Sequence, residues 1–270
     1  MGGAARYFRL LFAFARFGLT RELAFRGNFL IKITVEVLWL ILLLIFYSTV
    51  FTKTSVIASW SEAEYLFFVG CYFALEGVME TFFMSNCSEF ADLVRSGDLD
   101  FFLLKPIDEQ FLISCRSIDW STVPTVFMGS GVMVTGLVKM GWHFDPLQLL
   151  LFAVLFVCGV GTAYGFLLLL TSTSVWFMRN QSLWELWWLF TSLMRYPKEI
   201  FAGRLAAPLG WFFTFIVPVL IVVNVPACVM AKRLFDPAWI AFLVLAAAVL
   251  LVVSRRVFRA ALRHYRSASS

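Results

Sequence analysis

Three glutamates, Glu36, Glu76 and Glu80, stand inside long apolar runs of the sequence. A carboxylate in such surroundings is costly unless it faces a cavity, a partner charge or the interior of a helix bundle. Each is therefore a candidate for handling a proton or a polar substrate group. Glu76 and Glu80 are four residues apart, so they share one helix face. Their charges would repel, which favours a proton on one of them or contact of both with water.

A structural role is the alternative for these carboxylates. Lys32 precedes Glu36 by one helical turn and would form an ion pair with it, and arginines in a nearby loop offer further partners. Counting residues along the predicted helices puts Glu36 and Glu80 in the inner half of a bilayer. Two interpretations follow: polar groups that pack and pair within the bundle, or a gate and path for a substrate.

A second candidate site is the segment from Ser85 to Ser117, which mixes charges with large apolar side chains. Gly97 predicts the end of a short helix that begins near Ser88. Asp98 or Asp100 would cap a following turn that Pro106 closes. Apolar anchors among charges are typical of a surface that docks into a groove on another protein. The docking residues predicted from this segment are Glu89, Asp92, Arg95, Gly97, Asp98, Leu99, Asp100, Lys105 and Pro106.

No other pattern of residues indicates catalysis. The two histidines, His143 and His264, are far apart and lack a ligand or nucleophile at a useful spacing. The five cysteines show no paired spacing. A phosphate-binding loop of the form G-x-x-x-x-G-K-S/T is absent from the sequence, so ATP hydrolysis by this chain is not expected. We predict no catalytic residue, no metal site and no cofactor held by this chain.

The elements that position these residues are transmembrane helices. Of the 270 residues, 61% are hydrophobic and 14% are charged, whereas about a quarter of a soluble domain is charged. The net charge of +5 does not indicate nucleic-acid binding, because the basic residues cluster beside apolar runs. The sequence predicts an all-α integral membrane protein, with a single transmembrane domain over residues 1–270.

Five segments are long and apolar enough to cross a bilayer: residues 28–51, 63–84, 118–138, 147–175 and 238–253. Arginines concentrate before the first and after the last of them. By the positive-inside rule both termini are cytoplasmic and the number of crossings is even. We therefore expect a sixth span from Leu183 to about Phe201. Residues 202–232, interrupted by Pro208, Pro218 and Pro226, then form outer re-entrant helices.

The segment before the first span, residues 1–27, is amphipathic. Arg6, Arg9 and Arg16 fall on a narrow basic stripe, and aromatic and aliphatic residues cover the rest of the helix. Such a helix lies in the inner membrane interface. It acts as a lipid anchor or also contacts a cytoplasmic partner. No cleavable signal peptide is expected at this end.

The sequence resembles the permeases of the ABC transporter type-2 family, over nearly its whole length. The resemblance rests mainly on Ser96-Gly97-Asp98-Leu99-Asp100, followed by Leu103-Leu104-Lys105-Pro106. Weaker matches are Arg26-Gly27-Asn28-Phe29, the pair Tyr196-Pro197 and the proline-broken stretch through Pro218 and Pro226. In such proteins the loop between the second and third spans holds a coupling helix that sits on an ATPase subunit.

The resemblance implies a six-span exporter subunit in the plasma membrane, the cytoplasmic or inner membrane of a cell. Its partners would be separate ABC ATPase subunits that bind ATP and Mg, a second permease that is identical or different, and membrane lipids. The substrate would be hydrophobic or amphipathic, and Tyr196 and Pro197 would lie near an outer gate. The alternatives are a non-transporting scaffold or channel subunit and a membrane-embedded transferase, for which the sequence lacks a convergent catalytic set.

Overall fold

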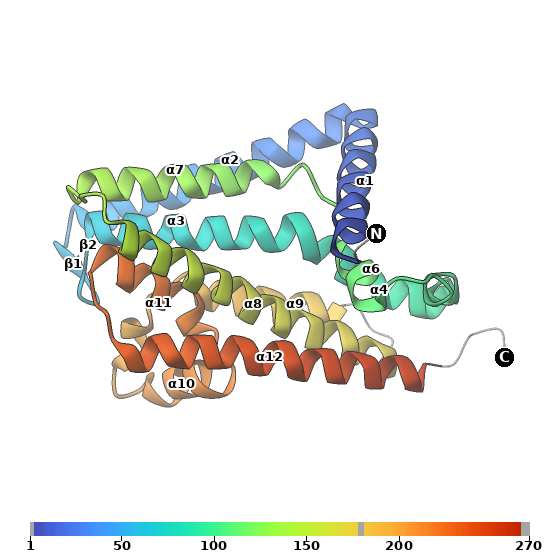
Figure 1. The fold of residues 1–270 in the computed structure, drawn as a ribbon. Coiled ribbons are helices and arrows are strands. Elements are labelled where there is room, and N and C mark those ends of the chain that lie inside the picture. Colours follow the sequence, from blue (N-terminus) through green and yellow to red (C-terminus); the bar gives the residue numbers. More distant parts are fainter. Residues whose placement is uncertain (1–2, 178–180, 266–270) are drawn as a thin grey trace.

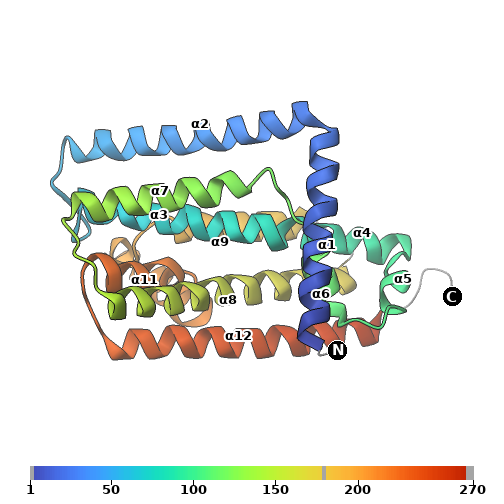
Figure 2. The ribbon, with the colours of Figure 1, turned by 45° about the horizontal axis from the view of Figure 1, so that its top comes forward.

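The computed structural model describes residues 3–177 and 181–265, which are almost entirely helical. Long helices run side by side along one direction, and α1 (Gly3–Ala24) lies across one end of them (Figures 1 and 2). The first described helix begins, and the last described helix ends, at this same end of the bundle. The long helices are α2 (Arg26–Phe51), α3 (Glu62–Met79), α7 (Val123–Lys139), α8 (Pro146–Phe177), α9 (Gln181–Met194) and α12 (Pro237–His264).

The all-α prediction is confirmed, apart from one short hairpin at the end of the bundle away from the termini. Strands β1 (Val56–Ile57) and β2 (Trp60–Ser61) pair antiparallel there. Ala58 and Ser59 form the turn with positive φ of 48° and 69°. Trp60 is fully buried, and its indole Nε1 donates a hydrogen bond to Glu199 Oε2 at 3.1 Å. The hairpin is thereby fixed to a segment far along the chain.

Within the described residues, four helical runs are long and apolar enough to cross a membrane: Arg26–Phe51, Glu62–Ser96, Pro146–Trp176 and Pro237–His264. The second run is the longest, because α3 continues through a π-helical turn, η1 (Glu80–Met84), into α4 (Ser85–Ser96). A bent pair of helices between residues 207 and 231 would make a fifth span. α7 has 17 residues and is shorter than these runs.

Two predicted spans have wrong boundaries. α7 begins at Val123 rather than at residue 118, because the Asp119 carboxylate accepts hydrogen bonds from the Ser121 backbone N–H at 3.0 Å and from its hydroxyl. These bonds hold residues 118–122 in a turn. α9 ends at Met194 rather than near Phe201, because Pro197 disfavours helical backbone before it. A 3₁₀ helix, η2 (Lys198–Ala202), follows.

The proline-broken stretch folds into α10 (Ala207–Trp211), a second π-helical turn η3 (Phe212–Ile216) and α11 (Leu220–Ala231). The chain bends by 88° between η3 and α11, at Pro218. Both ends of this stretch lie near the hairpin: Gly210 packs against Phe201, and Lys232 Nζ donates to the Ser59 carbonyl at 2.9 Å. α11 is buried along nearly its whole length and packs on α8 and α3.

The core centres on α3, whose middle turns are almost fully buried. Its closest neighbour is α7, and glycines on both helices allow this approach. A Cβ atom on Gly129 would lie 2.4 Å from Ala74 N, and one on Gly70 would lie 2.5 Å from Met133 N. Glycine at these positions is therefore required for backbone-to-backbone packing. Gly165 of α8 likewise packs against Leu250 of α12.

Gly129→Ala should lower the unfolding temperature of the purified protein by at least about 5 °C, since the added methyl group must push α3 and α7 apart. Gly131→Ala is the matched control on the same helix, because a Cβ there meets no atom within 4 Å. A thermal unfolding measurement by intrinsic fluorescence compares the two. Equal unfolding temperatures would contradict the glycine-dependent crossing.

Candidate functional site

The charged segment between α3 and α7 folds into three short helices at the end of the bundle that carries both termini (Figures 1 and 2). They are α4, α5 (Leu99–Leu103) and α6 (Glu109–Cys115). Gly97 ends α4 with φ of 82°, the left-handed conformation that glycine adopts without steric cost, which confirms the predicted helix stop. Asp98 stands at the N-cap position of α5, and Asp108 caps α6 by accepting from Phe111 N at 3.1 Å.

One side of this segment is anchored in a small hydrophobic core of its own. Phe90, Val94 and Leu99 pack there with Leu168 of α8 and Phe258 of α12. Leu99, one of the predicted docking residues, is fully buried. Its side chain therefore holds α5 onto α4 and the bundle, while its neighbours form the surface.

The opposite side of the charged segment is exposed. Phe101 and Leu104 are 67% and 82% exposed, which is unusual for large apolar side chains that lie among charges. Gly97 and Asp100 are half-buried beside them. The remaining predicted docking residues are all exposed: Glu89, Asp92, Arg95, Asp98, Lys105 and Pro106. We call the exposed residues of α4 and α5, together with Leu104, Lys105 and Pro106, the α4–α5 surface.

Polar contacts tie the base of this surface to three distant helices. Arg255 of α12 donates to Asp108 Oδ2 at 2.6 Å and to Gln110 Oε1 at 3.1 Å. Gln110 Nε2 donates to the Tyr164 hydroxyl of α8 at 2.9 Å. The Tyr7 hydroxyl of α1 accepts from Asp108 N at 3.2 Å. The segment is therefore linked to α1, α8 and α12.

Two of the glutamates within the predicted spans line a separate hollow. Glu36 of α2 and Glu80 of η1 line a hollow of about 300 Å³ near the end of the bundle that carries the termini. Lys32 pairs with Asp119 at 3.3 Å, so the expected ion pair of Lys32 with Glu36 is wrong. Ile31 and Val35 of α2 and Met84 of η1 form the apolar walls of this hollow.

The electrostatics of the hollow favour a negative charge on Asp119, which lies in the turn before α7. Burial raises its pKa, but hydrogen bonds from Ser121 and the positive charge of Lys32 outweigh burial and lower the pKa overall. The pKa of the neighbouring Glu22 of α1 is shifted in the opposite direction, because burial and the negative charge of Asp119 raise it. The mouth of the hollow therefore holds one fixed anion beside Lys32.

Glu76 lies on α3, one helical turn before Glu80, and faces α9 and α2. The charges of Arg195 and Glu36 act on Glu76, and its carboxylate bonds with the Tyr72 hydroxyl. Arg195, at the end of α9, donates to the Tyr72 hydroxyl at 3.3 Å, and its guanidinium lies over the rings of Trp39 and Tyr72. Arg195 falls within the predicted sixth span, and the sequence did not indicate its contacts with Tyr72 and Trp39.

Tyr196 and Pro197 follow Arg195 at the point where α9 ends. Tyr196 is 39% exposed, and its hydroxyl interacts electrostatically with the buried side chains of Tyr47 and Tyr65. Pro197 is buried and begins η2. Together these side chains form a polar track on α3 and its neighbours, from the hollow to the hairpin end: Lys32, Asp119, Glu36, Glu80, Glu76, Tyr72, Arg195 and Tyr196.

The π-helical turn η1 is a feature that the sequence did not indicate. It holds Glu80 and lies where the apolar run ends and the charged segment begins. Such turns often occur at functional sites, because they rotate the following residues relative to the preceding helix. Residues 3–177 and 181–265 contain no cluster of three or more His, Cys, Asp or Glu that could hold a metal.

A family model described as ABC-2 family transporter protein matches residues 37–269, which is most of the chain. The chain belongs to the ABC-2 transporter family. No curated protein and no solved structure matches it. Membership makes the chain a membrane component of a transport system, and ABC-2 permeases normally partner with ABC ATPase subunits. The α4–α5 surface and the polar track are the two candidate sites of this ABC-2 family member.

Arg255→Gln should loosen α6 from the bundle and speed its backbone hydrogen exchange by roughly fivefold. The reason is that removing a half-exposed charged contact costs about 1 kcal/mol. Arg256→Gln is the matched control, since Arg256 is the next residue of α12 and is exposed. Exchange of the Glu109–Cys115 peptide, followed by mass spectrometry, provides the measurement. Equal exchange in the two variants would mean that the Arg255 contacts do not anchor the loop.

Proposed function

We propose that this chain is the permease subunit of an ATP-driven ABC-2 exporter in the plasma membrane. It would work as a pair of permeases with two separate ATPase subunits, which bind ATP and Mg. The observation that carries this proposal is the α4–α5 surface. It combines the exposed side chains of Phe101 and Leu104 with charged residues, and it is anchored to α8 and α12 of the bundle. A surface of this kind suits the groove of a soluble partner.

We propose six spans, with the termini in the cytoplasm. The start of α1 and the end of α12 lie at one end of the bundle, which supports an even number of crossings (Figure 1). For residues 203–232 we propose a re-entrant pair of helices on the outer side. The contacts of Gly210 with Phe201 and of Lys232 with Ser59 support this, because both ends of the stretch then lie at the hairpin end. α9 would be the shortest span, at about 21 Å.

The coupling mechanism follows from the anchoring of the loop. ATP binding would draw the two ATPase subunits together and carry the α4–α5 surface with them. Because Arg255, Gln110 and Asp108 link this segment to α8 and α12, the movement would reorient those spans. The energy comes from the partner, and the permease supplies two packed arrangements of similar free energy.

The path for the substrate would follow the polar track beside α2. α2 packs little against the rest of its own chain, since only 6% of its most apolar stretch of 18 residues is buried. A second permease would cover this helix and enclose the track. Glu36, Glu76 and Glu80, with Tyr196 and Pro197 at the outer end, are the residues proposed to line the path. A hydrophobic or amphipathic substrate suits the apolar walls of the hollow.

The competing functions make different predictions about partners. A scaffold or channel subunit would purify without an ATPase. A membrane-embedded transferase would need a convergent set of nucleophile and base, whereas the glutamates of the polar track are accompanied by Arg195 and tyrosines. The α4–α5 surface favours the permease over both alternatives.

The double substitution Phe101→Ala and Leu104→Ala should reduce recovery of the ATPase subunit with the permease at least tenfold. Two exposed apolar anchors, each of which contributes about 1 kcal/mol or more, would be lost from the interface. Leu205→Ala is the control, because Leu205 is 97% exposed outside the α4–α5 surface. Affinity purification followed by mass spectrometry measures the recovery. Normal recovery at normal abundance would rule out this surface as the docking site.

Glu76→Gln should keep the folded state but change transport-coupled ATP hydrolysis by the complex several-fold, because it alters the charge that faces Arg195. Glu185→Gln provides the comparison, since Glu185 is an exposed residue of α9. The unfolding temperature and the ATPase rate of the reconstituted complex are measured side by side. Unchanged hydrolysis in both variants would assign Glu76 a structural role only.

A further inference from the structure

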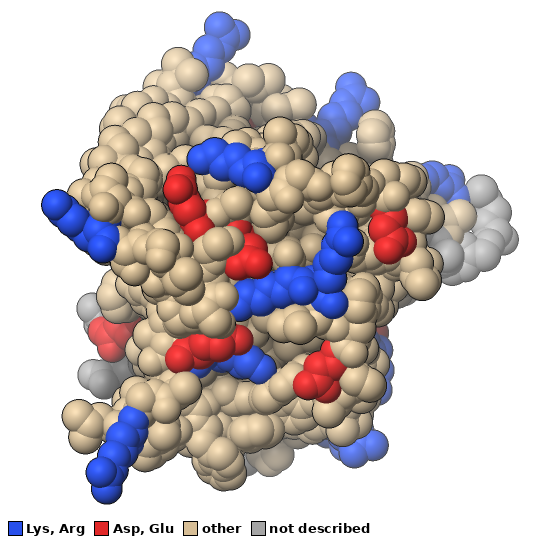
Figure 3. Space-filling model, turned by 90° about the vertical axis from the view of Figure 1, so that its left-hand side faces the viewer, with Lys and Arg blue, Asp and Glu red and all other residues tan. Residues whose placement is uncertain are grey.

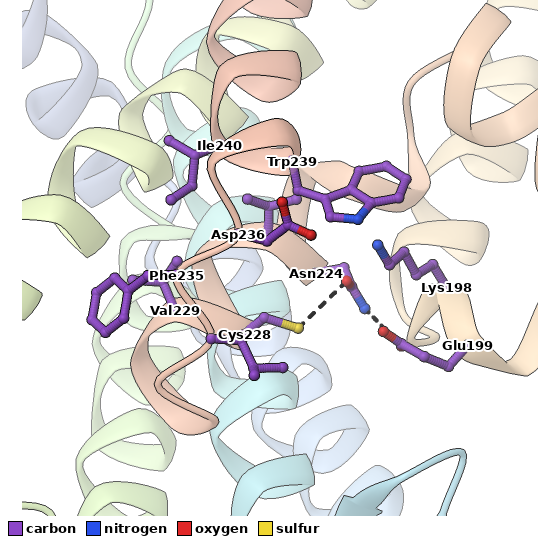
Figure 4. A pocket seen from close by; sticks show the side chains of 11 residues that line it. Lys198, Glu199, Asn224, Cys228, Val229, Phe235, Asp236, Trp239 and Ile240 are labelled. Carbon is purple, nitrogen blue, oxygen red and sulfur yellow. Dashed lines mark hydrogen bonds between the residues drawn. The ribbon is translucent and has the colours of Figure 1, made fainter.

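A second cavity lies at the opposite end of the bundle from the α4–α5 surface. It has a volume of about 340 Å³ and is formed by η2, α11 and the beginning of α12 (Figure 4). Its polar residues are Lys198, Glu199, Asn224 and Asp236, and valines, isoleucine and aromatic rings form the other walls. The face of the molecule at this end carries mixed basic and acidic side chains (Figure 3). The volume is at the lower end of the range for small-ligand sites.

Several polar atoms of this cavity are already occupied. Glu199 Oε2 accepts from Trp60 Nε1 at 3.1 Å and from Asn224 Nδ2 at 3.0 Å. Asp236 Oδ1 caps α12 by accepting from Ala238 N at 2.9 Å. These bonds fix both carboxylates in place. The second oxygen of each has no hydrogen-bond donor among the described residues and remains available to a ligand.

Lys198 is the complementary group. Its ammonium lies 3.2 Å from the centroid of the Trp239 ring, and it has no hydrogen-bond or ion-pair partner within residues 3–177 and 181–265. Burial lowers the pKa of Lys198, against the opposing charges of Glu199 and Asp236. Figure 4 shows Lys198 and Asp236 approaching the space beside Trp239 from two sides. The cavity thus offers a free donor cation and free acceptor anions in one chamber.

The charge distribution selects the ligand. One lysine and two carboxylates leave the cavity with a net charge of −1, which disfavours an anion, and Lys198 disfavours a simple cation. A zwitterion satisfies both sides, with its phosphate on Lys198 and its ammonium on Asp236 or Glu199. The Lys198 ammonium already occupies a face of the Trp239 ring, so a trimethylammonium group cannot stack on that face. A primary ammonium, which donates hydrogen bonds, fits better.

A neighbouring hollow provides space for an acyl chain. It shares Lys198, Glu199 and Trp239 with the first cavity, has a volume of about 370 Å³, and its remaining walls are mostly apolar. Aromatic rings gather here as well: Phe215 stacks on Trp239 and contacts Trp211. Aromatic side chains concentrate at the level of lipid headgroups in membrane proteins.

We propose that the cavity bounded by η2, α11 and the start of α12 binds the headgroup of a phosphoethanolamine lipid. The phosphate contacts Lys198, the ammonium contacts Asp236 or Glu199, and one chain lies in the apolar hollow beside Trp239. This site differs from the polar track and does not depend on the transport role. It would place a lipid against the re-entrant segment and fix its position in the membrane.

Native mass spectrometry of the full chain, with short-chain lipids of different headgroups, tests this proposal. We expect tighter binding of the phosphoethanolamine lipid than of phosphocholine or phosphoglycerol lipids with the same chains. Lys198→Gln should weaken it at least fivefold, while Lys53→Gln, an exposed lysine outside the cavity, should leave it unchanged. Equal adducts for all three headgroups, or equal loss in both variants, would overturn the proposal.

Asp236→Asn separates binding from folding, because asparagine still caps α12 while the charge is removed. The cavity then becomes neutral, so preference should move from the phosphoethanolamine to the phosphoglycerol lipid. An unchanged preference would contradict the assignment of the ammonium to the carboxylates. Glycerophosphoethanolamine, which lacks acyl chains, should compete only at tenfold or higher concentration. Competition at equal concentration would identify a site for a free headgroup and overturn the lipid assignment.

Discussion

The continuous helical run from Glu62 to Ser96 is the constraint on which the other features depend. Its 35 residues extend about 52 Å, whereas the hydrocarbon core of a bilayer is about 30 Å thick. One end is therefore inside the membrane bundle and the other projects beyond it. The buried turns of α3 carry Glu76, and the projecting α4 carries the α4–α5 surface. A continuous helical run thus connects the polar track with the α4–α5 surface, and η1 lies at the junction.

The packing around this run holds α3 and α4 in place. Gly70 and Gly129 bring α3 and α7 into backbone contact. α4 is held separately, through Phe90 and Val94 against α8 and α12. Arg195, Tyr72 and Glu76 add a polar contact with α9, which is costly to break in a low-dielectric environment. α8 contacts both α3 and α4, on either side of η1.

The sequence predicted much of this arrangement, because hydropathy and glycine placement are local signals. The α-helical class, the span before Phe51 and the helix stop at Gly97 were correct. The start of α7 was wrong, because the side-chain bonds of Asp119 override an apolar pattern. The partners of Arg195 and Lys32 were missed, since both contacts join residues more than 80 positions apart. Burial of Leu99 was also missed, because it depends on Phe258 of α12.

The side of the membrane on which the α4–α5 surface lies tests the account most directly. With the five native cysteines replaced by alanine, a single cysteine at Ser96→Cys, an exposed position at the end of α4, can be labelled with a membrane-impermeant maleimide in intact cells and in inverted membrane vesicles. The account predicts labelling of this cysteine in inverted vesicles and none in intact cells. Labelling in intact cells would place the surface outside, away from any ATPase, and would contradict the coupling mechanism.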